Sequence, residues 1–456
     1  MKMKFLLSAL SSLCCAAVSV FAASDYSLKV TMTPKDGILQ ENETVTLRCR
    51  LLKKNQPAKG VALRVITRWE RNDVASRDFP FDETHQECTV SYKGTKPGWV
   101  YFGFQVIDAN GKVVATPGKQ IKQRLKSKEY LYETGAVFSP EKIIAVDTYP
   151  ADMEEFWAKE KQKVYDMPMK PELTEIPVKG KFKGKIRHWS LVVNCPGRYP
   201  VTGYMAIPVG AKKKSLPVII DYQSLVSQDV PPTRVCHYAA GSGCAHVYVT
   251  WHGFPTGRKQ SFYVKERYKT PVTAEIGKAD KWFYHDMFLR AIRTLQFAKT
   301  LPEWNGKDLV VRGGSLGGWQ SAGAAAVDHD VTMALVSVPG GCEFFGGKVG
   351  RRSGGIFKSS SNEKLLEKPA VARTAALHDC VNFAKMIKCE TYVCTGFSDE
   401  LCCPSGVYAF YNNIPAGVTK DMTTYPETGH YGTTSNTKGD ARLGKGVGSA
   451  LVQEDK

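Results

Sequence analysis

Residues 312–326 read RGGSLGGWQSAGAAA, with a single serine, Ser315, set between glycines ahead of an alanine-rich run. This stretch allows two interpretations. It is either a flexible turn, or the G-x-S-x-G pattern of a strand-to-helix elbow that exposes a nucleophilic hydroxyl. The preceding DLVV, residues 308–311, is typical of a buried strand, and the small residues that follow suit a helix packed closely on a sheet. The glycines would permit the tight turn between the two.

Apolar runs of strand length recur on both sides of this stretch and alternate with helical segments. Residues 152–167 and 283–301 have the pattern of helices. Eight runs are predicted as strands: HWSLVV, YMAIPV, PVIIDY, AHVYVTW, DLVVRGG, MALVSVP, TYVCTGF and MTTYP. Alternating strands and helices indicate a mostly parallel sheet with helices on both faces. A serine directly after the fifth of eight strands predicts an α/β-hydrolase fold, which favours the elbow.

The region from Tyr26 to about Gln120 has a different character, because its β-branched runs are short and alternating. The predicted strands are TVTLRCRL, GVALRVITRWE, ECTVSYKG, GWVYFGFQVID and KVVATPGKQI. This spacing predicts a small all-β sandwich of immunoglobulin type, which we assign to residues 24–122. The hydrolase domain is assigned to residues 123–456 and begins with a polar connector. Within the sandwich, Cys49 and Cys88 could bridge neighbouring strands.

The chain begins MKMKFLLSALSSLCCAAVSVFAAS. A basic start at Lys2 and Lys4, an apolar stretch and a small-x-Ala site predict a signal peptide over residues 1–22. The apolar stretch is too short for a stable membrane anchor, and no later stretch is apolar enough to span a bilayer. We therefore expect a secreted or periplasmic protein without a stable membrane anchor.

The 456-residue chain has a formal net charge of +18. Its lysines are scattered, and no nucleic-acid-binding motif accompanies them, so we expect no nucleic-acid partner. The charge instead suits solubility or attraction to an acidic polymer, such as a glycan that bears uronic acids. Thirteen cysteines include no C-x-x-C pair with a matching histidine pair, which argues against a zinc site. We expect neither a metal nor a cofactor.

A serine hydroxyl becomes a good nucleophile when a base accepts its proton and a carboxylate fixes the tautomer of that base. In this fold the chain order is serine, then aspartate or glutamate, then histidine. His430 follows the last predicted strand in YPETGHYG, which makes it the candidate base ahead of His329 and His378. Asp399 follows the penultimate strand in TYVCTGFSDELCCPS and is the candidate acid, with Glu400 as the neighbouring alternative.

Acyl transfer also needs backbone donors for the oxyanion. The N–H of Leu316, the residue after the nucleophile, is the first expected donor. The second is expected from the loop after the third strand, DYQSLVSQ, at Leu225 or a neighbour. The pair His252-Gly253 has the form of an oxyanion motif but follows the fourth strand, so we interpret it as a pocket or loop element.

Several stretches together resemble the acetyl xylan esterase and cephalosporin C deacetylase family, carbohydrate esterase family seven. They are WFYHDMFLRAIRTLQF, PEWNGKDLVVRGGSLGG, AAAVDHDV, VPGGCEF, GFSDELCCPSGVYAFYN and YPETGH. The resemblance covers roughly Glu133 to His430 and excludes the predicted sandwich. It implies that Ser315 is the nucleophile, Asp399 the acid and His430 the base, and it places the second oxyanion amide at Leu225.

The chain departs from the family pattern near the serine. Leu316 stands where the family usually has glutamine, and a backbone donor survives that change. Trp319 replaces a glycine and either lines the substrate pocket or packs in the core. Ser224 and Leu225 replace a glycine and a tyrosine in the third-strand loop, which bears on the second oxyanion donor and on substrate range. Family members often form hexamers, which leaves a homo-oligomer open.

The sequence thus predicts a secreted serine esterase that removes acetyl groups from acetylated carbohydrates through an acyl-enzyme. Two alternatives stay open. A prolyl-oligopeptidase-like peptidase shares the fold and the elbow, although no acidic signature for gripping a peptide N-terminus is present. A catalytically inactive, glycan-binding hydrolase homologue is favoured by the altered oxyanion loop and disfavoured by the intact Ser, Asp, His order.

Overall fold

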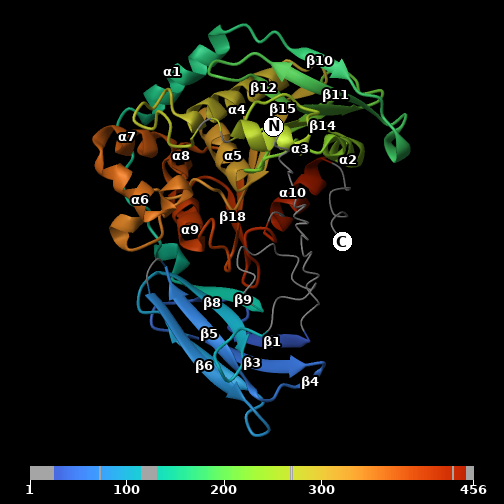
Figure 1. Cartoon of the computed structure of the whole chain (residues 1–456). Coiled ribbons are helices and arrows are strands. Elements are labelled where there is room, and N and C mark those ends of the chain that lie inside the picture. Colours follow the sequence, from blue (N-terminus) through green and yellow to red (C-terminus); the bar gives the residue numbers. More distant parts are fainter. Residues whose placement is uncertain are drawn as a thin grey trace, which may run out of the picture.

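The structure is a computed structural model that comprises an N-terminal β region and an α/β domain (Figure 1). It describes residues 25–70, 73–114, 131–267, 269, 271–433 and 436–447. The predicted signal peptide lies outside these residues. Among the described helices, none combines the length and the apolar character that a membrane crossing requires.

The α/β domain is built on one nine-stranded sheet. In spatial order its strands are β10 (Glu172–Glu175), β11 (Ile186–Val193), β12 (Val201–Pro208), β14 (Ala245–Val249), β13 (Leu216–Tyr222), β15 (Trp304–Gly314), β16 (Met333–Ser337), β17 (Glu390–Gly396) and β18 (Lys420–Tyr425). Pairings from β10 to β14 are antiparallel and those from β14 to β18 are parallel. The predicted mostly parallel hydrolase sheet is confirmed. The additional strand, β10, has four exposed residues and therefore lacks an apolar pattern.

Helices pack on both faces of this sheet (Figure 1). One face carries α1 (Met153–Asp166), α4 (Phe283–Lys299), α5 (Leu316–Val327), α8 (Cys380–Met386) and α9 (Pro404–Asn413). The other face carries α2 (Pro232–Ser242) and α10 (Thr437–Val447). Strand β13 shows the division, because Val218 and Ile220 join the first core while Ile219 packs in a cluster with Leu443 of α10.

Shorter helices lie in the connections. They are α3 (Gln260–Arg267), α6 (Ser360–Glu363) and α7 (Pro369–His378), with the 3-10 turns η1 (Pro140–Lys142), η2 (Gly180–Phe182), η3 (Gly346–Val349), η4 (Gly355–Lys358) and η5 (Lys364–Glu367). The two helices predicted from periodicity correspond to α1 and α4, which agree with the expected ranges to within two residues at each end.

The N-terminal region consists of two sheets around one apolar core. The first sheet contains β1 (Tyr26–Thr33), β3 (Thr44–Lys53), β4 (Gln56–Pro57) and β7 (Cys88–Lys93). The second contains β2 (Ile38–Leu39), β9 (Tyr132–Phe138), β8 (Gly98–Ile107), β5 (Val61–Trp69) and β6 (Asp73–Phe81). An immunoglobulin-type topology for this region stays a prediction.

Two details of this region differ from the sequence pattern. Strand β9 lies inside the stretch that was expected to be a polar connector, and it pairs antiparallel with β8. Its short apolar run is hard to recognise because lysines and glutamates precede it. Cys49 and Cys88 are register partners on β3 and β7, as expected of neighbouring strands, but both are free thiols in the structure.

The N-terminal β region binds the two loops that follow β17 and β18. The indole Nε1 of Trp99 donates a hydrogen bond to the carbonyl of Phe397 at 2.7 Å. The carbonyl of Pro426 accepts hydrogen bonds from the Thr134 hydroxyl, at 3.0 Å, and from the Gly135 amide, at 3.2 Å. Figure 1 shows β8 and β9 next to the end of the α/β domain where β18 lies.

A buried carboxylate strengthens this contact. Glu70 accepts hydrogen bonds from the backbone N–H of Trp99 and from the hydroxyl of Ser405, each at 2.8 Å. Burial raises the pKa of Glu70 to about 7, even though both hydrogen bonds favour its charged form. Ser405 lies in the first turn of α9, so Glu70 connects the β region directly to the segment that follows the β17 loop.

We predict that Trp99→Phe destabilises the protein through this contact. The substitution leaves the Phe397 carbonyl without its indole donor, and an unsatisfied buried acceptor costs about 1–3 kcal/mol. The measurement is urea unfolding of the whole chain. Trp69→Phe is the matched control, because Trp69 is also buried but its Nε1 has no hydrogen-bond partner among the described residues. Equal destabilisation by the two substitutions would mean that the interdomain bond adds no net stability.

Candidate active site

Ser315 lies at the junction of β15 and α5 with φ 56° and ψ −118°, a strained conformation for a residue with a side chain. The glycines around it are required by close packing. A Cβ on Gly317 would lie 2.1 Å from the carbonyl oxygen of Tyr222, and one on Gly313 would lie 2.5 Å from the backbone of Gly317. The stretch is therefore a tight elbow rather than a flexible turn.

The backbone of the elbow is held by its neighbours. The Ser315 amide donates to the carbonyl of Ser337 at 3.0 Å, and the Ser315 carbonyl accepts from the Gly340 amide at 2.9 Å. Both partners belong to β16 or to the loop that follows it. These bonds fix the direction of the serine side chain, which is partly exposed at the carboxyl edge of the sheet.

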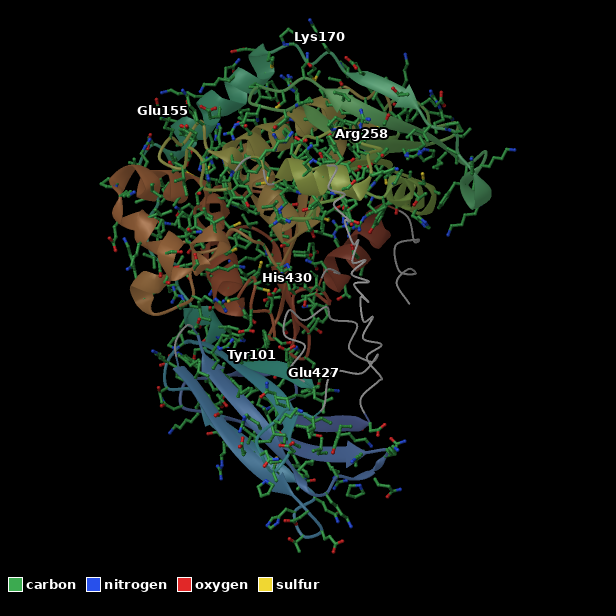
Figure 2. All side chains as sticks on the ribbon, in the orientation of Figure 1. Tyr101, Glu155, Lys170, Arg258, Glu427 and His430 are labelled. Carbon is green, nitrogen blue, oxygen red and sulfur yellow. The ribbon has the colours of Figure 1, made fainter. Side chains whose placement is uncertain are left out.

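Three predicted residues meet at this edge. The imidazole Nε2 of His430 is 3.0 Å from the hydroxyl oxygen of Ser315, and its Nδ1 is 2.8 Å from the carboxylate of Asp399. Asp399 is completely buried, and its second carboxylate oxygen accepts the amides of Leu401 and Cys402 at 2.8 and 2.9 Å. Figure 2 shows His430 on the side of the α/β domain that faces the N-terminal β region.

The environment of His430 acts on its pKa in two directions. Burial disfavours the imidazolium and lowers the pKa, whereas the charge of Asp399, together with its hydrogen bond and the neighbouring Cys402, raises it by more. The net pKa of His430 is therefore above its ordinary range. A carboxylate at Nδ1 also fixes the tautomer that leaves Nε2 available to accept a proton from Ser315.

Cys402 is a site residue to which the sequence analysis gave no role. Its thiol interacts with His430, and one ligand atom from each of Asp399, Cys402 and His430 lies within 4.8 Å of the others. These atoms of Asp399 and His430 are already engaged in the hydrogen bonds to each other and to Ser315. We therefore interpret the cluster as part of that hydrogen-bonded chain. The spacing of Cys402 three residues after Asp399 is the signal that could have identified it.

The predicted oxyanion residues lie on both sides of the elbow. Leu316 is the first residue of α5, where backbone N–H groups have no acceptor within the helix and the helix dipole favours negative charge. The loop after β13 is attached to the elbow because the hydroxyl of Ser224 donates to the carbonyl of Gly314 at 2.8 Å. Leu225, the next residue, has a side chain that is 38 % exposed.

Trp319 lies in the core of the α/β domain, and it is not among the residues that line the pocket beside the site. Only 2 % of it is exposed, and its indole Nε1 donates to the carbonyl of His378 at 2.7 Å. Its ring contacts four aromatic side chains, those of Trp282, Tyr284, Phe288 and Phe344. Of the two interpretations of this residue, the structure favours core packing.

The other candidate histidines, His252, His329 and His378, make no hydrogen bond or ring contact with Ser315 in the described part of the chain. His252 is buried and stacks on Phe254, with ring centroids 4.6 Å apart, so it is an element of its own loop. His378 is buried against His285, whose Nδ1 is 3.1 Å from its Nε2. His329 is exposed in the turn between α5 and β16. Among these candidates, His430 is the one that contacts the elbow serine.

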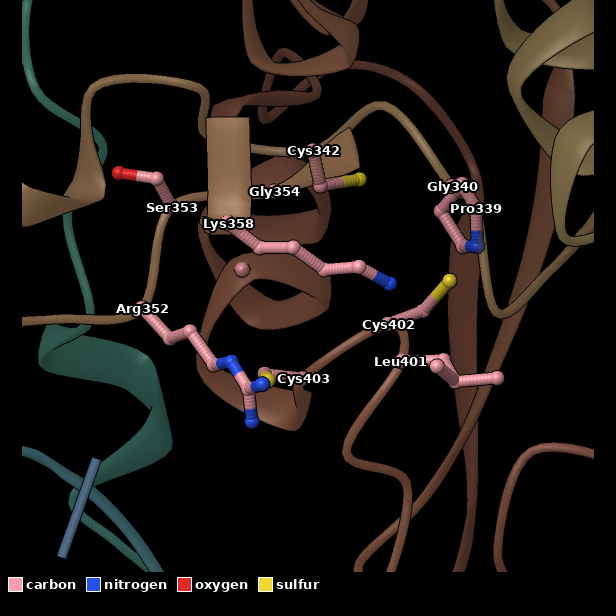
Figure 3. A pocket seen from close by; sticks show the side chains of 11 residues that line it. Pro339, Gly340, Cys342, Arg352, Ser353, Gly354, Lys358, Leu401, Cys402 and Cys403 are labelled. Carbon is pink, nitrogen blue, oxygen red and sulfur yellow. The ribbon is translucent and has the colours of Figure 1, made fainter. Parts of the chain in front are cut away.

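A small pocket lies beside residues that contact Ser315 and His430 (Figure 3). Its wall includes Gly340, whose amide binds the Ser315 carbonyl, and Cys402, whose thiol interacts with His430. Pro339, Leu401, Arg352 and Lys358 also line it. Ser315 and His430 themselves are not among the residues that line it.

Sheet topology and site geometry define an α/β-hydrolase whose serine, histidine and aspartate form one hydrogen-bonded chain. The sequence profile described as "Acetyl xylan esterase (AXE1)" matches residues 141–441. The chain belongs to this acetyl xylan esterase family and is a carboxylic ester hydrolase.

Individual relatives agree with this assignment. An acetyl esterase, Axe7A, of Xylanibacter ruminicola is 24% identical over 320 residues, which cover 68% of this chain and 70% of that protein. An acetyl xylan esterase from Paenibacillus sp. R4 has a TM-score of 0.58 at 22% identity and covers 68% of this chain and 98% of its own. Acetyl xylan esterase 1 from Thermoanaerobacterium sp. JW/SL YS485 has a TM-score of 0.56 at 20% identity, with coverages of 69% and 98%. The two structures establish likeness of fold.

We predict that Trp319→Ala destabilises the protein by about 3–5 kcal/mol, the usual effect of removing a large buried aromatic side chain. The relative turnover of p-nitrophenyl acetate, propionate and butyrate should stay that of the wild type, because the indole is not part of the pocket wall. Thermal unfolding and the three kcat/KM values provide the measurements. If the variant is nearly as stable as the wild type but has a weaker preference for short acyl groups, Trp319 lines the substrate pocket and the core-packing interpretation is wrong.

Proposed function

We propose that this protein is a serine esterase that releases acetate from acetylated carbohydrates by way of an acyl-enzyme. The observation that carries the proposal is the hydrogen-bond chain from Ser315 through His430 to the buried Asp399. The acetyl ester as substrate is supported by the family and by relatives that are named acetyl esterase and acetyl xylan esterase.

In the first half of the reaction, the Ser315 hydroxyl attacks the carbonyl carbon of the acetyl group while Nε2 of His430 accepts its proton. The Nδ1–H of His430 donates a hydrogen bond to the carboxylate of Asp399, which stabilises the imidazolium that forms. The negative charge that develops on the carbonyl oxygen is stabilised by the N–H of Leu316 at the start of α5, with a second donor proposed at Leu225.

Collapse of the tetrahedral intermediate breaks the bond to the sugar oxygen, which takes the proton from Nε2 of His430 and leaves as a hydroxyl. Water then attacks the acetyl-serine, with His430 accepting its proton, and a second tetrahedral intermediate releases acetate and restores the Ser315 hydroxyl. The serine hydroxyl supplies the proton that the sugar takes, and the attacking water supplies the proton that restores the serine. No atom changes its oxidation state, so the proposed reaction needs no oxidant or reductant.

We also propose that the protein is exported, because the basic start and apolar stretch of residues 1–22 have the form of a cleaved signal peptide. Extracellular or periplasmic placement would suit a polymeric carbohydrate substrate. The mass of the protein recovered from its native host distinguishes a cleaved from an intact N-terminus. A homo-oligomer stays an expectation from the family resemblance.

We predict that Ser315→Ala lowers acetate release from acetylated xylo-oligosaccharides by roughly 10⁴- to 10⁶-fold. The same substitution should abolish covalent labelling by a fluorophosphonate. Ser361→Ala, an exposed serine of α6, is the control and should retain both activities. A wild-type chain that neither labels nor releases acetate would instead be the inactive homologue. Faster turnover of an aminoacyl-proline anilide than of p-nitrophenyl acetate would favour the peptidase.

The pKa of His430 leads to a pH prediction. Protonated His430 cannot accept the serine proton, so activity rises as pH increases through its pKa. Asp399 raises that pKa by stabilising the imidazolium. We predict that Asp399→Asn lowers kcat by roughly 10⁴-fold and moves the acidic limb of the residual activity to lower pH. The pH profile of kcat/KM is the measurement. An acidic limb that is unmoved, or moves to higher pH, would contradict the assigned role of Asp399.

A further inference from the structure

The pocket beside the catalytic serine contains two cationic side chains, Arg352 and Lys358 (Figure 3). Both belong to the segment around η4, which follows β16 and precedes α6. In Figure 3 the amine of Lys358 extends toward the sulfur of Cys402, and the guanidinium of Arg352 lies beside Cys403. The acetyl ester group is neutral, so the proposed reaction does not by itself explain these charges.

Arg352 differs from the arginine that precedes it. Arg351 forms a buried ion pair with Glu343 and donates a second hydrogen bond to the carbonyl of Ile144. Arg352 has a long ion pair of 3.8 Å with Glu400, and its side chain is 30 % exposed. An arginine has five N–H donors, so most of those on Arg352 are left for a ligand.

Glu400 does not cancel the charge of the pocket. Its carboxylate also forms an ion pair with Arg68 of the N-terminal β region. Arg68 and Arg352 therefore share one carboxylate. Lys358 is exposed and has no ion pair or hydrogen bond with any described residue. The lining near Lys358 consists of uncharged groups and the thiols of Cys342 and Cys402, so the excess charge is positive.

The cations line the same pocket as two residues that contact Ser315 and His430. The same pocket wall contains Gly340, whose amide is 2.9 Å from the Ser315 carbonyl oxygen, and Cys402, whose thiol interacts with His430. A substituent of the sugar, or of an adjoining sugar, that enters this pocket while the acetyl group is at Ser315 would meet Arg352 and Lys358.

We propose that this pocket binds a carboxylate of the substrate, so that the preferred substrates are acetylated saccharides that carry a uronic acid. The proposal rests on the deacetylase function and specifies its substrate class. A planar guanidinium matches a carboxylate in a two-bond fork, and an adjacent ammonium adds a third charge-assisted hydrogen bond. The formal net charge of +18 would also attract an acidic polymer to the enzyme before it reaches the site.

The test compares a charged and a neutral substrate of the same shape. The charged one is an O-acetylated hexuronate, and the neutral one is the corresponding O-acetylated hexuronamide. The readout is the ratio of their kcat/KM values for acetate release by the full chain at low ionic strength. We expect the wild type to favour the hexuronate by roughly tenfold or more, the effect of one well-placed charge-assisted hydrogen bond. The ratio should fall toward one as salt is raised to about 0.5 M, because salt screens exposed charges.

Lys358→Gln and Arg352→Gln should each lower the hexuronate-to-hexuronamide ratio several-fold, and the double variant should bring it close to one. Lys348→Gln is the control, because Lys348 is an exposed lysine of the nearby turn η3 that does not line this pocket. It should keep the wild-type ratio. A wild-type ratio near one, or a ratio that neither substitution changes, would overturn the proposal. Preference for a matched O-acetylated hexose sulfate over the hexuronate would overturn the assignment to a carboxylate.

A binding measurement separates this inference from the proposed function. Calorimetric titration of sodium glucuronate into the Ser315→Ala chain detects the anion site without turnover. In the Ser315→Ala chain, Lys358→Gln should weaken glucuronate binding and Lys348→Gln should leave it unchanged. This result supports the site even if no acetylated saccharide is a substrate. Acetate release from the hexuronamide with no glucuronate binding would uphold the deacetylase and reject the anion site.

Discussion

The site depends first on one backbone constraint, the strained positive-φ conformation of Ser315 between β15 and α5. It is maintained because α5 begins in van der Waals contact with the sheet, which only glycine at 317 permits beside the Tyr222 carbonyl. The two hydrogen bonds of the Ser315 backbone to β16 and the loop after it complete the constraint. The side chain of Ser315 therefore has a fixed direction, and His430 and Asp399 are brought to it by other loops.

The candidate acid and base, Asp399 and His430, come from loops after β17 and β18, near the edge of the sheet where fewer neighbouring strands constrain them. The N-terminal β region supplies that constraint. Trp99 binds the carbonyl of Phe397, two residues before Asp399, and Gly135 binds that of Pro426, four residues before His430. Hydrogen-bond donors in a second domain thus help to determine the distance between a carboxylate and an imidazole in the first.

Local pattern and chain order were sufficient to place the elbow, the alternating strands and the order of Ser315, Asp399 and His430. They also favoured Asp399 over Glu400, and in the structure Asp399 contacts His430 while Glu400 faces Arg68. Contacts between distant segments carry no such local signal. The Trp99 bond spans 298 positions, and the core packing of Trp319 depends on aromatic residues contributed by α4 and by the loop after β16.

Glu70 is buried between the N-terminal β region and the hydrolase domain, and this affects whether the two domains can be separated in evolution. A detachable accessory domain is joined to its enzyme by a flexible linker with few contacts across the boundary, so it can be lost or exchanged. Here separation would leave a buried carboxylate, an indole and two loop carbonyls to be rehydrated at once. The β region and the hydrolase domain should therefore unfold, and evolve, as one cooperative body.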